Sequence, residues 1–180
     1  MKSMTKCIIL NGASSSGKST IIKALQTLMP DLAHVRLSDI AFLYFGMFHD
    51  NYFHDPEWGE VRYKRQVAIR EMVIAQSLIM LKQGFDICID TTFDGPKADE
   101  MMQYYLGSLK DFNPIMIGII CDLEVLEQRE IARGDRKAGW GRAQIEDGIH
   151  QNRPYAFTVD NTTNSPEETT KIIFNNLKNF

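Results

Sequence analysis

Residues 12–20 combine two glycines, a lysine and several hydroxyl side chains at spacings suited to phosphate binding. The segment consists of Gly12, Ala13, Ser14, Ser15, Ser16, Gly17, Lys18, Ser19 and Thr20, and it fits the P-loop pattern G-x-x-x-x-G-K-[ST]. Glycines allow a turn whose N–H groups converge, and a helix beginning at Lys18 would add its partial positive charge. Lys18 would then contact the β- and γ-phosphates of a nucleotide, and the Ser19 hydroxyl would ligate Mg²⁺. A serine-rich turn capping an ordinary helix is the alternative, but the apolar strand before the motif favours nucleotide binding.

Two acidic residues follow apolar runs, at the places where a parallel sheet binds its ligands. Asp90 ends the run 85–90, and its carboxylate could hold Mg²⁺ or its waters; a turn acid or a helix cap is the alternative. Asp39 follows the second run, and it could orient and deprotonate a hydroxyl that accepts a phosphoryl group. The residues alone leave open whether Ser38 or Asp39 is instead the N-cap of a helix over 40–47.

Three arginines lie close together beside a glycine, and their spacing suggests a lid. Arg129 and Arg133 are four residues apart on one helix face, where like charges repel. Together with Arg136, they suit a lid that closes over a triphosphate and stabilises the charge of the transition state. A solvated basic face is the alternative. We expect the lid over about residues 129–142, with a flexible glycine-rich stretch over 137–141.

The elements that must position these residues alternate between strands and helices. Near-continuous apolar runs are typical of strands buried on both faces, as in a parallel sheet covered by helices. We expect strands over residues 5–10, 34–37, 85–90, 115–121 and 157–160. We expect helices from Lys18 to before Pro30, over 60–83, over 123–133 after an Asp122 N-cap, and after a Ser165–Glu168 capping box. Asp160 is expected to organise the turn that flanks the nucleotide base.

Length and composition limit the classes of protein to consider. The 180 residues are enough for one domain with its own core, and we expect a single domain over 1–180. A formal net charge of −3 gives no general attraction to nucleic acid or to an anionic membrane, so we expect neither as a partner. The first apolar run is too short for a signal peptide or a membrane span, which favours a cytoplasmic protein. The three cysteines fall in expected strands and the four histidines lack metal-site spacing, so we assign neither set a metal role.

The P-loop and the arginine segment together resemble the chloramphenicol phosphotransferase-like proteins, a family of P-loop small-molecule kinases. The resemblance covers most of the chain; it is strongest over 8–19 and 121–136, and residues 159–163 are also similar. It implies an α/β fold of the shikimate-kinase type, with a five-stranded parallel sheet flanked by helices. It also implies ATP and Mg²⁺ as the phosphoryl donor, a small-molecule hydroxyl as the acceptor, and Asp39 as the general base. Arg133 and Arg136 match the family's lid motif.

The segment expected to line the acceptor, over about 39–60, departs from the chloramphenicol-modifying version. It is rich in aromatic residues, namely Phe42, Tyr44, Phe45, Phe48, Tyr52, Phe53 and Trp58. After Asp90 the chain continues Thr91-Thr92-Phe93-Asp94-Gly95, without a second acid beside the first. We therefore expect a kinase for a small, partly aromatic alcohol, unless the aromatic residues only pack the helix and loop. The alternatives are a metabolite or nucleotide kinase of the same fold and a non-catalytic ATP-binding regulatory module.

Overall fold

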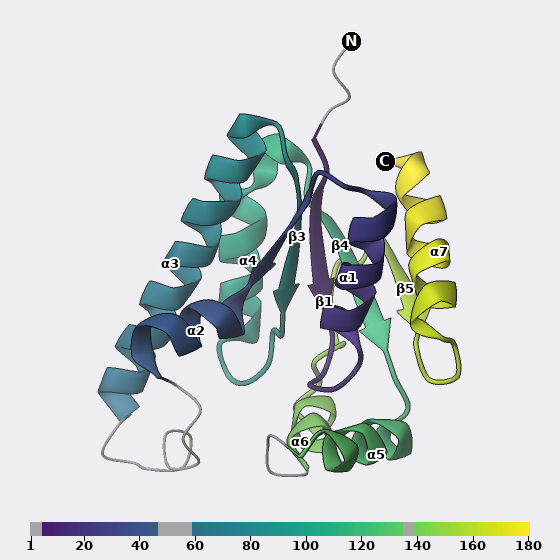
Figure 1. Ribbon diagram of the computed structural model, residues 1–180. Helices are drawn as coiled ribbons and strands as arrows, with labels where there is room; N and C mark the ends of the chain where they lie inside the picture. The colour runs from purple at the N-terminus through teal and green to yellow at the C-terminus, as the bar shows by residue number, and fades with distance from the viewer. Residues whose placement is uncertain (1–4, 47–58, 135–138) are drawn as a thin grey trace.

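Five parallel strands form one sheet with helices on both faces in the computed structural model, which describes residues 5–46, 59–134 and 139–180 (Figure 1). The strands are β1 (Cys7–Asn11), β2 (Leu32–Arg36), β3 (Asp86–Thr91), β4 (Ile115–Ile120) and β5 (Phe157–Asp160). Their order across the sheet is β2-β3-β1-β4-β5. Because β1 is the central strand, the P-loop that follows it lies in the middle of the sheet's carboxyl edge. The five-stranded parallel sheet expected from the sequence is confirmed.

Helices cover both faces of the sheet and its carboxyl edge. They are α1 (Lys18–Leu28), α2 (Leu37–Phe45), α3 (Gly59–Gln83), α4 (Ala98–Ser108), α5 (Leu123–Arg133), α6 (Trp140–Glu146) and α7 (Pro166–Asn176), with short 3₁₀ helices η3 (Lys110–Phe112) and η4 (Leu177–Asn179). Helices α1 and α7 cover one face, α3 and α4 cover the other, and α5 and α6 lie beyond the carboxyl ends of the strands (Figure 1). Among these helices, none combines the length and the apolar character needed to cross a membrane.

Successive residues of β1 divide between two apolar cores, because side chains of a strand alternate between its faces. Ile8 and Leu10 pack with side chains of α1 and α7, whereas Cys7 and Ile9 pack with side chains of α3 and α4. All four side chains are inaccessible to solvent. This burial fixes the strand on both sides, and it therefore fixes the start of the loop that follows Asn11.

The junction between β2 and α2 differs from the sequence expectation. The predicted strand over 34–37 is wrong at both ends, since β2 spans Leu32–Arg36 and α2 begins at Leu37. Arg36 is the N-cap of α2 and makes no side-chain capping bond. Ser38 and Asp39 are therefore inside the first helical turn, and the alternative that either of them caps this helix is wrong. Leu37 is apolar and continues the pattern of the strand, so the sequence analysis placed the end of the strand one residue too late.

Two helix caps expected from the sequence are present. The Asp122 carboxylate accepts a hydrogen bond from the Glu124 N–H at 2.9 Å, at the start of α5. Ser165 and Glu168 form a reciprocal capping box at the start of α7. Helices α4 and α6 lie in stretches where the sequence analysis predicted no helix, and α6 contacts the P-loop.

Candidate active site

The P-loop is held in shape by an asparagine from the far end of the chain. Gly17 has a φ of 97°, in the left-handed region that favours glycine, and a Cβ there would lie 2.5 Å from Nδ2 of Asn161. Asn161 is buried after β5; its Nδ2 donates to the Ser16 carbonyl at 2.7 Å, and its Oδ1 accepts from the Thr169 hydroxyl at 2.7 Å. The backbone of the loop is thus supported by the side chain of Asn161, which Thr169 of α7 holds in turn, and the N-terminus of α1 is directed at the loop.

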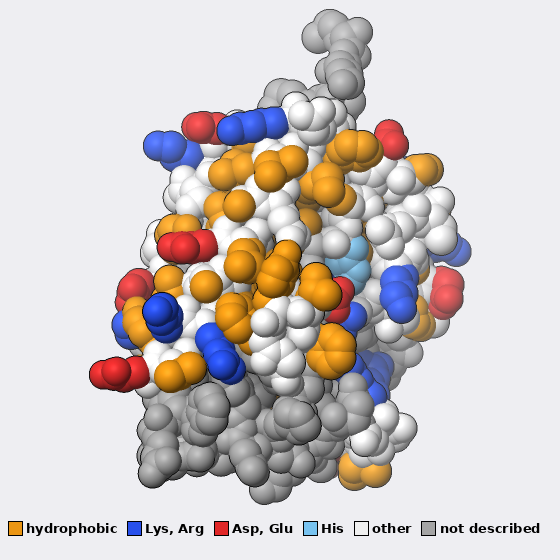
Figure 2. Space-filling view, turned by 60° about the vertical axis from the view of Figure 1, so that its left-hand side comes forward, with side chains coloured by type: hydrophobic (Ala, Val, Ile, Leu, Met, Phe, Trp, Pro, Cys, Tyr) orange, Lys and Arg blue, Asp and Glu red, His pale blue; other side chains and the backbone are white. Residues whose placement is uncertain are grey.

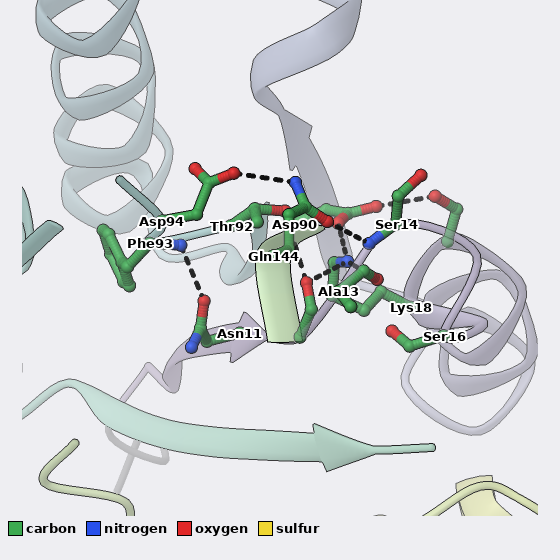
Figure 3. A network of polar contacts seen from close by, with 12 residues as sticks. Asn11, Ala13, Ser14, Ser16, Lys18, Asp90, Thr92, Phe93, Asp94 and Gln144 are labelled. Carbon is green, nitrogen blue, oxygen red and sulfur yellow. Dashed lines mark hydrogen bonds and ion pairs between the residues drawn. The ribbon is translucent and has the colours of Figure 1, made fainter. Parts of the chain in front are cut away.

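Lys18 and Asp90 lie close together at the end of the P-loop (Figure 3), and Ser19 contacts Asp90. The Lys18 side chain is 8% exposed; its Nζ donates to the carbonyls of Gly12 at 2.8 Å and Ala13 at 3.0 Å, and lies 3.9 Å from Oδ1 of Asp90. The Ser19 hydroxyl donates to Oδ2 of Asp90 at 2.6 Å. A buried ammonium therefore lies beside a hydroxyl and a carboxylate, the arrangement that the sequence predicted for phosphate and metal binding.

The electrostatics of Asp90 keep its carboxylate ionised. Burial raises the pKa of Asp90, but His34, the charge of Lys18 and the Ser19 hydroxyl outweigh it and lower the pKa to about 2. Nε2 of His34 lies 3.7 Å from Oδ2 of Asp90, which is longer than a hydrogen bond, so His34 acts as a nearby polar group. Sequence reasoning missed His34; β2 brings it opposite Cys88, two residues before Asp90.

The pair of Ser19 and Asp90 suits a hard divalent cation. Mg²⁺ prefers oxygen ligands and usually keeps several waters, with one or two carboxylates and substrate phosphates completing its shell. The described part of the chain contains no cluster of three or more His, Cys, Asp and Glu side chains that could hold a metal by themselves. A cation here would therefore take most of its ligands from phosphate and water, as in nucleotide sites.

Asp39 lies on the β2 side of this centre, at the same edge of the sheet. Strand pairing places Arg36 opposite Asp90, so α2 begins beside the metal-ligating candidate. The Asp39 side chain is 67% exposed, and its Oδ1 lies 3.3 Å from the Arg36 guanidinium. Unlike Asp90, Asp39 is accessible to a small molecule from solvent.

The arginines expected in the lid have different environments. Arg129 donates to the Asn161 carbonyl at 2.9 Å and to Cys121 Sγ at 3.3 Å, which anchors α5 to the turn after β5. Arg133 is exposed in the last turn of α5, and Arg136 lies outside the described residues. In the turn itself, Asp160 accepts the Thr162 N–H at 2.8 Å, which confirms its expected role in organising this turn.

Within the segment over 137–141, residues 139–141 are not the loose stretch that the glycines suggested. Residues 137 and 138 lie outside the described part of the chain, whereas Trp140 and Gly141 are the first residues of α6. The expectation of flexibility is therefore wrong for these two. Their N-terminal turn is hydrogen-bonded to α5, a contact that no local pattern in the sequence indicated.

Aromatic side chains expected near the acceptor are in part exposed. Phe42 and Tyr44 of α2 are 63% and 58% exposed, whereas Phe45 is half-buried against the core and has the Arg65 guanidinium 5.5 Å from its ring centroid. Figure 2 shows hydrophobic side chains gathered on the face that α2 and α3 form. The other four expected residues, Phe48, Tyr52, Phe53 and Trp58, lie outside the described residues.

A buried polar network behind the P-loop was also missed by sequence reasoning. Asn11, at the end of β1, donates to the Tyr155 hydroxyl at 2.6 Å and accepts the Phe93 N–H at 2.8 Å. His150 Nδ1 lies 2.8 Å from the same hydroxyl. The one signal available was a polar residue at the end of an otherwise apolar strand.

The sheet order, the P-loop after the central strand and the Lys18–Asp90 contact define the fold class of the P-loop kinases. Within that class, a family model of the chloramphenicol phosphotransferase-like proteins matches residues 5–178, and the chain belongs to this family. No curated protein matches the chain.

Several solved kinases share the fold over nearly the whole chain. An unliganded sugar kinase from Janibacter sp. HTCC2649 has 15% sequence identity and a TM-score of 0.69, covering 97% of this chain and 95% of its own. The APS kinase of Mycobacterium tuberculosis, in complex with AMPPNP and APS, has 11% identity and a TM-score of 0.69, with 97% and 98% covered. Shikimate kinase from Acinetobacter baumannii, in complex with shikimate, has 13% identity and a TM-score of 0.65, with 97% and 94% covered. At these identities the likeness establishes the fold alone.

Proposed function

We propose that this protein is an ATP-dependent phosphotransferase that moves the γ-phosphate of ATP to a hydroxyl of a small molecule. The observation that carries the proposal is the 2.6 Å contact of Ser19 with Asp90 beside the buried Lys18 ammonium. Membership of the family supports a kinase, and the ionised Asp90 supports a magnesium nucleotide as the donor.

Each candidate residue has a distinct role in this reaction. Lys18 and the P-loop amides would bind the phosphates, and Ser19 and Asp90 would hold Mg²⁺, which would neutralise phosphate charge. The acceptor oxygen forms a bond to the γ-phosphorus while the bond to the β–γ bridging oxygen breaks, and ADP leaves. The acceptor's proton passes to a carboxylate oxygen of Asp39. Arg129, Arg133 and Arg136 would add positive charge around the transferring group.

The acceptor would lie between Asp39 and the loop after β3. Phe42 and Tyr44 expose apolar surface one turn beyond Asp39 on α2, which favours an acceptor that carries an apolar or aromatic part as well as its hydroxyl. The formal net charge of −3 gives no general attraction to nucleic acid, which favours a small molecule over an oligonucleotide.

The test is a screen for ADP release from MgATP with a panel of hydroxylated small molecules, chloramphenicol among them, followed by mass spectrometry of the acceptor. We expect at least one aromatic alcohol to gain a phosphate with the wild-type protein and not with the Lys18→Ala variant. Binding of ATP without transfer to any member of the panel would favour the regulatory module. No binding of MgATP at all would contradict the proposal.

A further inference from the structure

A single side-chain amide joins the P-loop to the loop after β3. Oε1 of Gln144, in α6, accepts the Ser14 N–H at 2.6 Å, and its Nε2 donates to Oδ2 of Asp94 at 2.8 Å (Figure 3). Gln144 is 6% exposed; its contact with Ser14 is buried, and its contact with Asp94 is partly buried. We infer that Gln144 is a positioning residue that couples the donor loop to the acceptor-side loop; this inference rests on the proposed function.

Helix α6 is fixed in place by a carboxylate from α5. Glu130 is 3% exposed, and it accepts the N–H groups of Gly139 at 2.9 Å and Gly141 at 2.8 Å. Burial of a carboxylate requires such hydrogen bonds, because an unpaired charge in the interior is costly. Glu130 therefore connects the helix of the candidate lid arginines to the helix that carries Gln144.

The two peptide groups on either side of Ser14 both face α6. The Ser14 N–H donates to Gln144, and a Cβ on Gly141 would lie 3.2 Å from the Ser14 carbonyl oxygen and 3.2 Å from Glu130. Glycine at 141 suits this close approach, since a Cβ there would shift α6 or the loop by a few tenths of an ångström. Helix α6 thus packs directly on the backbone of the P-loop.

The hydrogen bond from Ser14 to Gln144 supports a strained part of the P-loop, because the residue after Ser14 has an uncommon backbone conformation. Ser15 has a φ of 61°, and a non-glycine residue in the left-handed region is held there by its surroundings. The hydrogen bond from the Ser14 N–H to Gln144 fixes the peptide group between Ala13 and Ser14, where that turn begins. Because the same amide binds Asp94, a change in the acceptor-side loop moves the group that holds the donor loop.

Amide hydrogen exchange tests the coupling without any nucleotide. We expect Gln144→Leu, which keeps the volume and loses both bonds, to raise exchange in peptides covering 12–17 and also 92–97. The matched control is Gln128→Leu, on the exposed face of α5, and it should leave both peptides as in the wild type. Faster exchange in neither peptide, or in only one of them, would overturn the coupling.

Binding of the magnesium complex of the ATP analogue AMPPNP is the second readout. We expect Gln144→Leu to weaken binding by about 3- to 10-fold, the loss of roughly one net hydrogen bond, with Gln128→Leu unchanged. Unchanged or tighter binding by Gln144→Leu would contradict the inference. If the wild-type protein binds no AMPPNP, the proposed function fails, and the exchange result still decides the coupling.

Exchanging the amide and the carboxylate between positions 144 and 94 distinguishes an effect of the hydrogen bond from an effect of side-chain volume. Gln144→Glu has the same shape but sets a carboxylate against Asp94, so we expect it to weaken AMPPNP binding at least as much as Gln144→Leu. Adding Asp94→Asn reverses donor and acceptor, and should restore binding to within about threefold of the wild type. A double variant no better than Gln144→Glu alone would show that these bonds do not position the loop. This pair also serves if Gln144→Leu fails to fold.

Discussion

The donor and acceptor sides of the candidate site are built in opposite ways. On the donor side, Lys18 and Asp90 are nearly inaccessible; Lys18 donates to carbonyls of the P-loop, and Asp90 accepts from the Ser19 hydroxyl of α1. Gln144 of α6 and Asn161 after β5 hold the backbone of that loop. On the acceptor side, Asp39 is 67% exposed, and its carboxylate forms an ion pair with Arg36 at the protein surface. The candidate phosphate-binding loop is thus supported by buried hydrogen bonds, whereas the proposed acceptor side is open to solvent.

The shape of the phosphate site depends on the fold, whereas the exposed carboxylate can be substituted with little effect on the fold. A phosphate site made of backbone N–H groups depends on loop shape, so it requires buried support from several elements. An exposed carboxylate depends little on its neighbours, because a surface ion pair contributes at most about 1 kcal/mol. Substitutions on the two sides should therefore change different quantities: nucleotide binding and stability on the donor side, and the transfer step on the acceptor side.

Lys18→Ala should have the largest effect and should affect both quantities. Loss of charged hydrogen bonds to phosphate and of charge stabilisation in the transition state together predict a decrease of about 10³- to 10⁵-fold in kcat/KM for MgATP. Phosphoryl transfer and AMPPNP titration measure it. Lys23→Ala, on the exposed face of the same helix, is the control and should be neutral; normal ATP affinity in Lys18→Ala would contradict the P-loop assignment.

Asp39→Asn should separate transfer from binding. Without a carboxylate to accept the proton, kcat should fall by about 10²- to 10⁴-fold, while the affinity for AMPPNP stays within twofold. Because the Arg36 ion pair is exposed, the melting temperature should hardly change. Arg36→Ala breaks the same ion pair and is the control for that loss; undiminished turnover in Asp39→Asn would remove Asp39 as the base.

The sequence predicted where Lys18, Ser19 and Asp90 lie, because the patterns that place them are local. Nine consecutive residues specify the P-loop, and the edge of a parallel sheet brings Asp90 to Ser19, as predicted. The same applies to the strands other than β2 and to the caps at Asp122 and Ser165, which depend on near neighbours.

The supports of the loop could not be predicted, since they connect residues far apart in the chain. Gln144 bonds to Ser14 across 130 residues, and Asn161 bonds to Ser16 across 145. Nothing near Gln144 in the sequence indicates its partner, and glycines beside it favoured flexibility rather than a docked helix. The boundary of α2 was misplaced for a local reason, because Leu37 extends the apolar pattern of β2 into a helix.

Asn161→Leu should lower the free energy of unfolding, because Asn161 supports the donor loop. The near-isosteric change leaves the Ser16 carbonyl and the Thr169 hydroxyl buried without their partner, which predicts a loss of about 2–4 kcal/mol in the free energy of unfolding. Urea denaturation measures it, and AMPPNP binding should weaken with it. Asn164→Leu, in the same turn, removes one exposed bond to the Asp160 carbonyl and should cost less than about 1 kcal/mol. Equal losses in the two variants would contradict the contrast between buried and exposed contacts.

His150 offers the smallest and most selective test, because it extends the buried donor side to the Tyr155 hydroxyl. Burial lowers the pKa of His150, and the positive charges of Lys18 and Arg153 lower it further. Since the folded-state pKa lies below the ordinary value of 6.5, the unfolded chain takes up the proton first as the pH falls. The stabilisation is therefore complete above pH 6.5 and is lost as the pH falls through the folded-state pKa. His150→Asn keeps a polar group at the Nδ1 position and cannot titrate, so its unfolding free energy should fall less than that of the wild type between pH 7.5 and 5.5. The other three histidines are present in both the wild type and the variant, so they do not affect the comparison. Parallel pH profiles would show that folding does not lower the pKa of His150, and they would contradict its burial beside Tyr155.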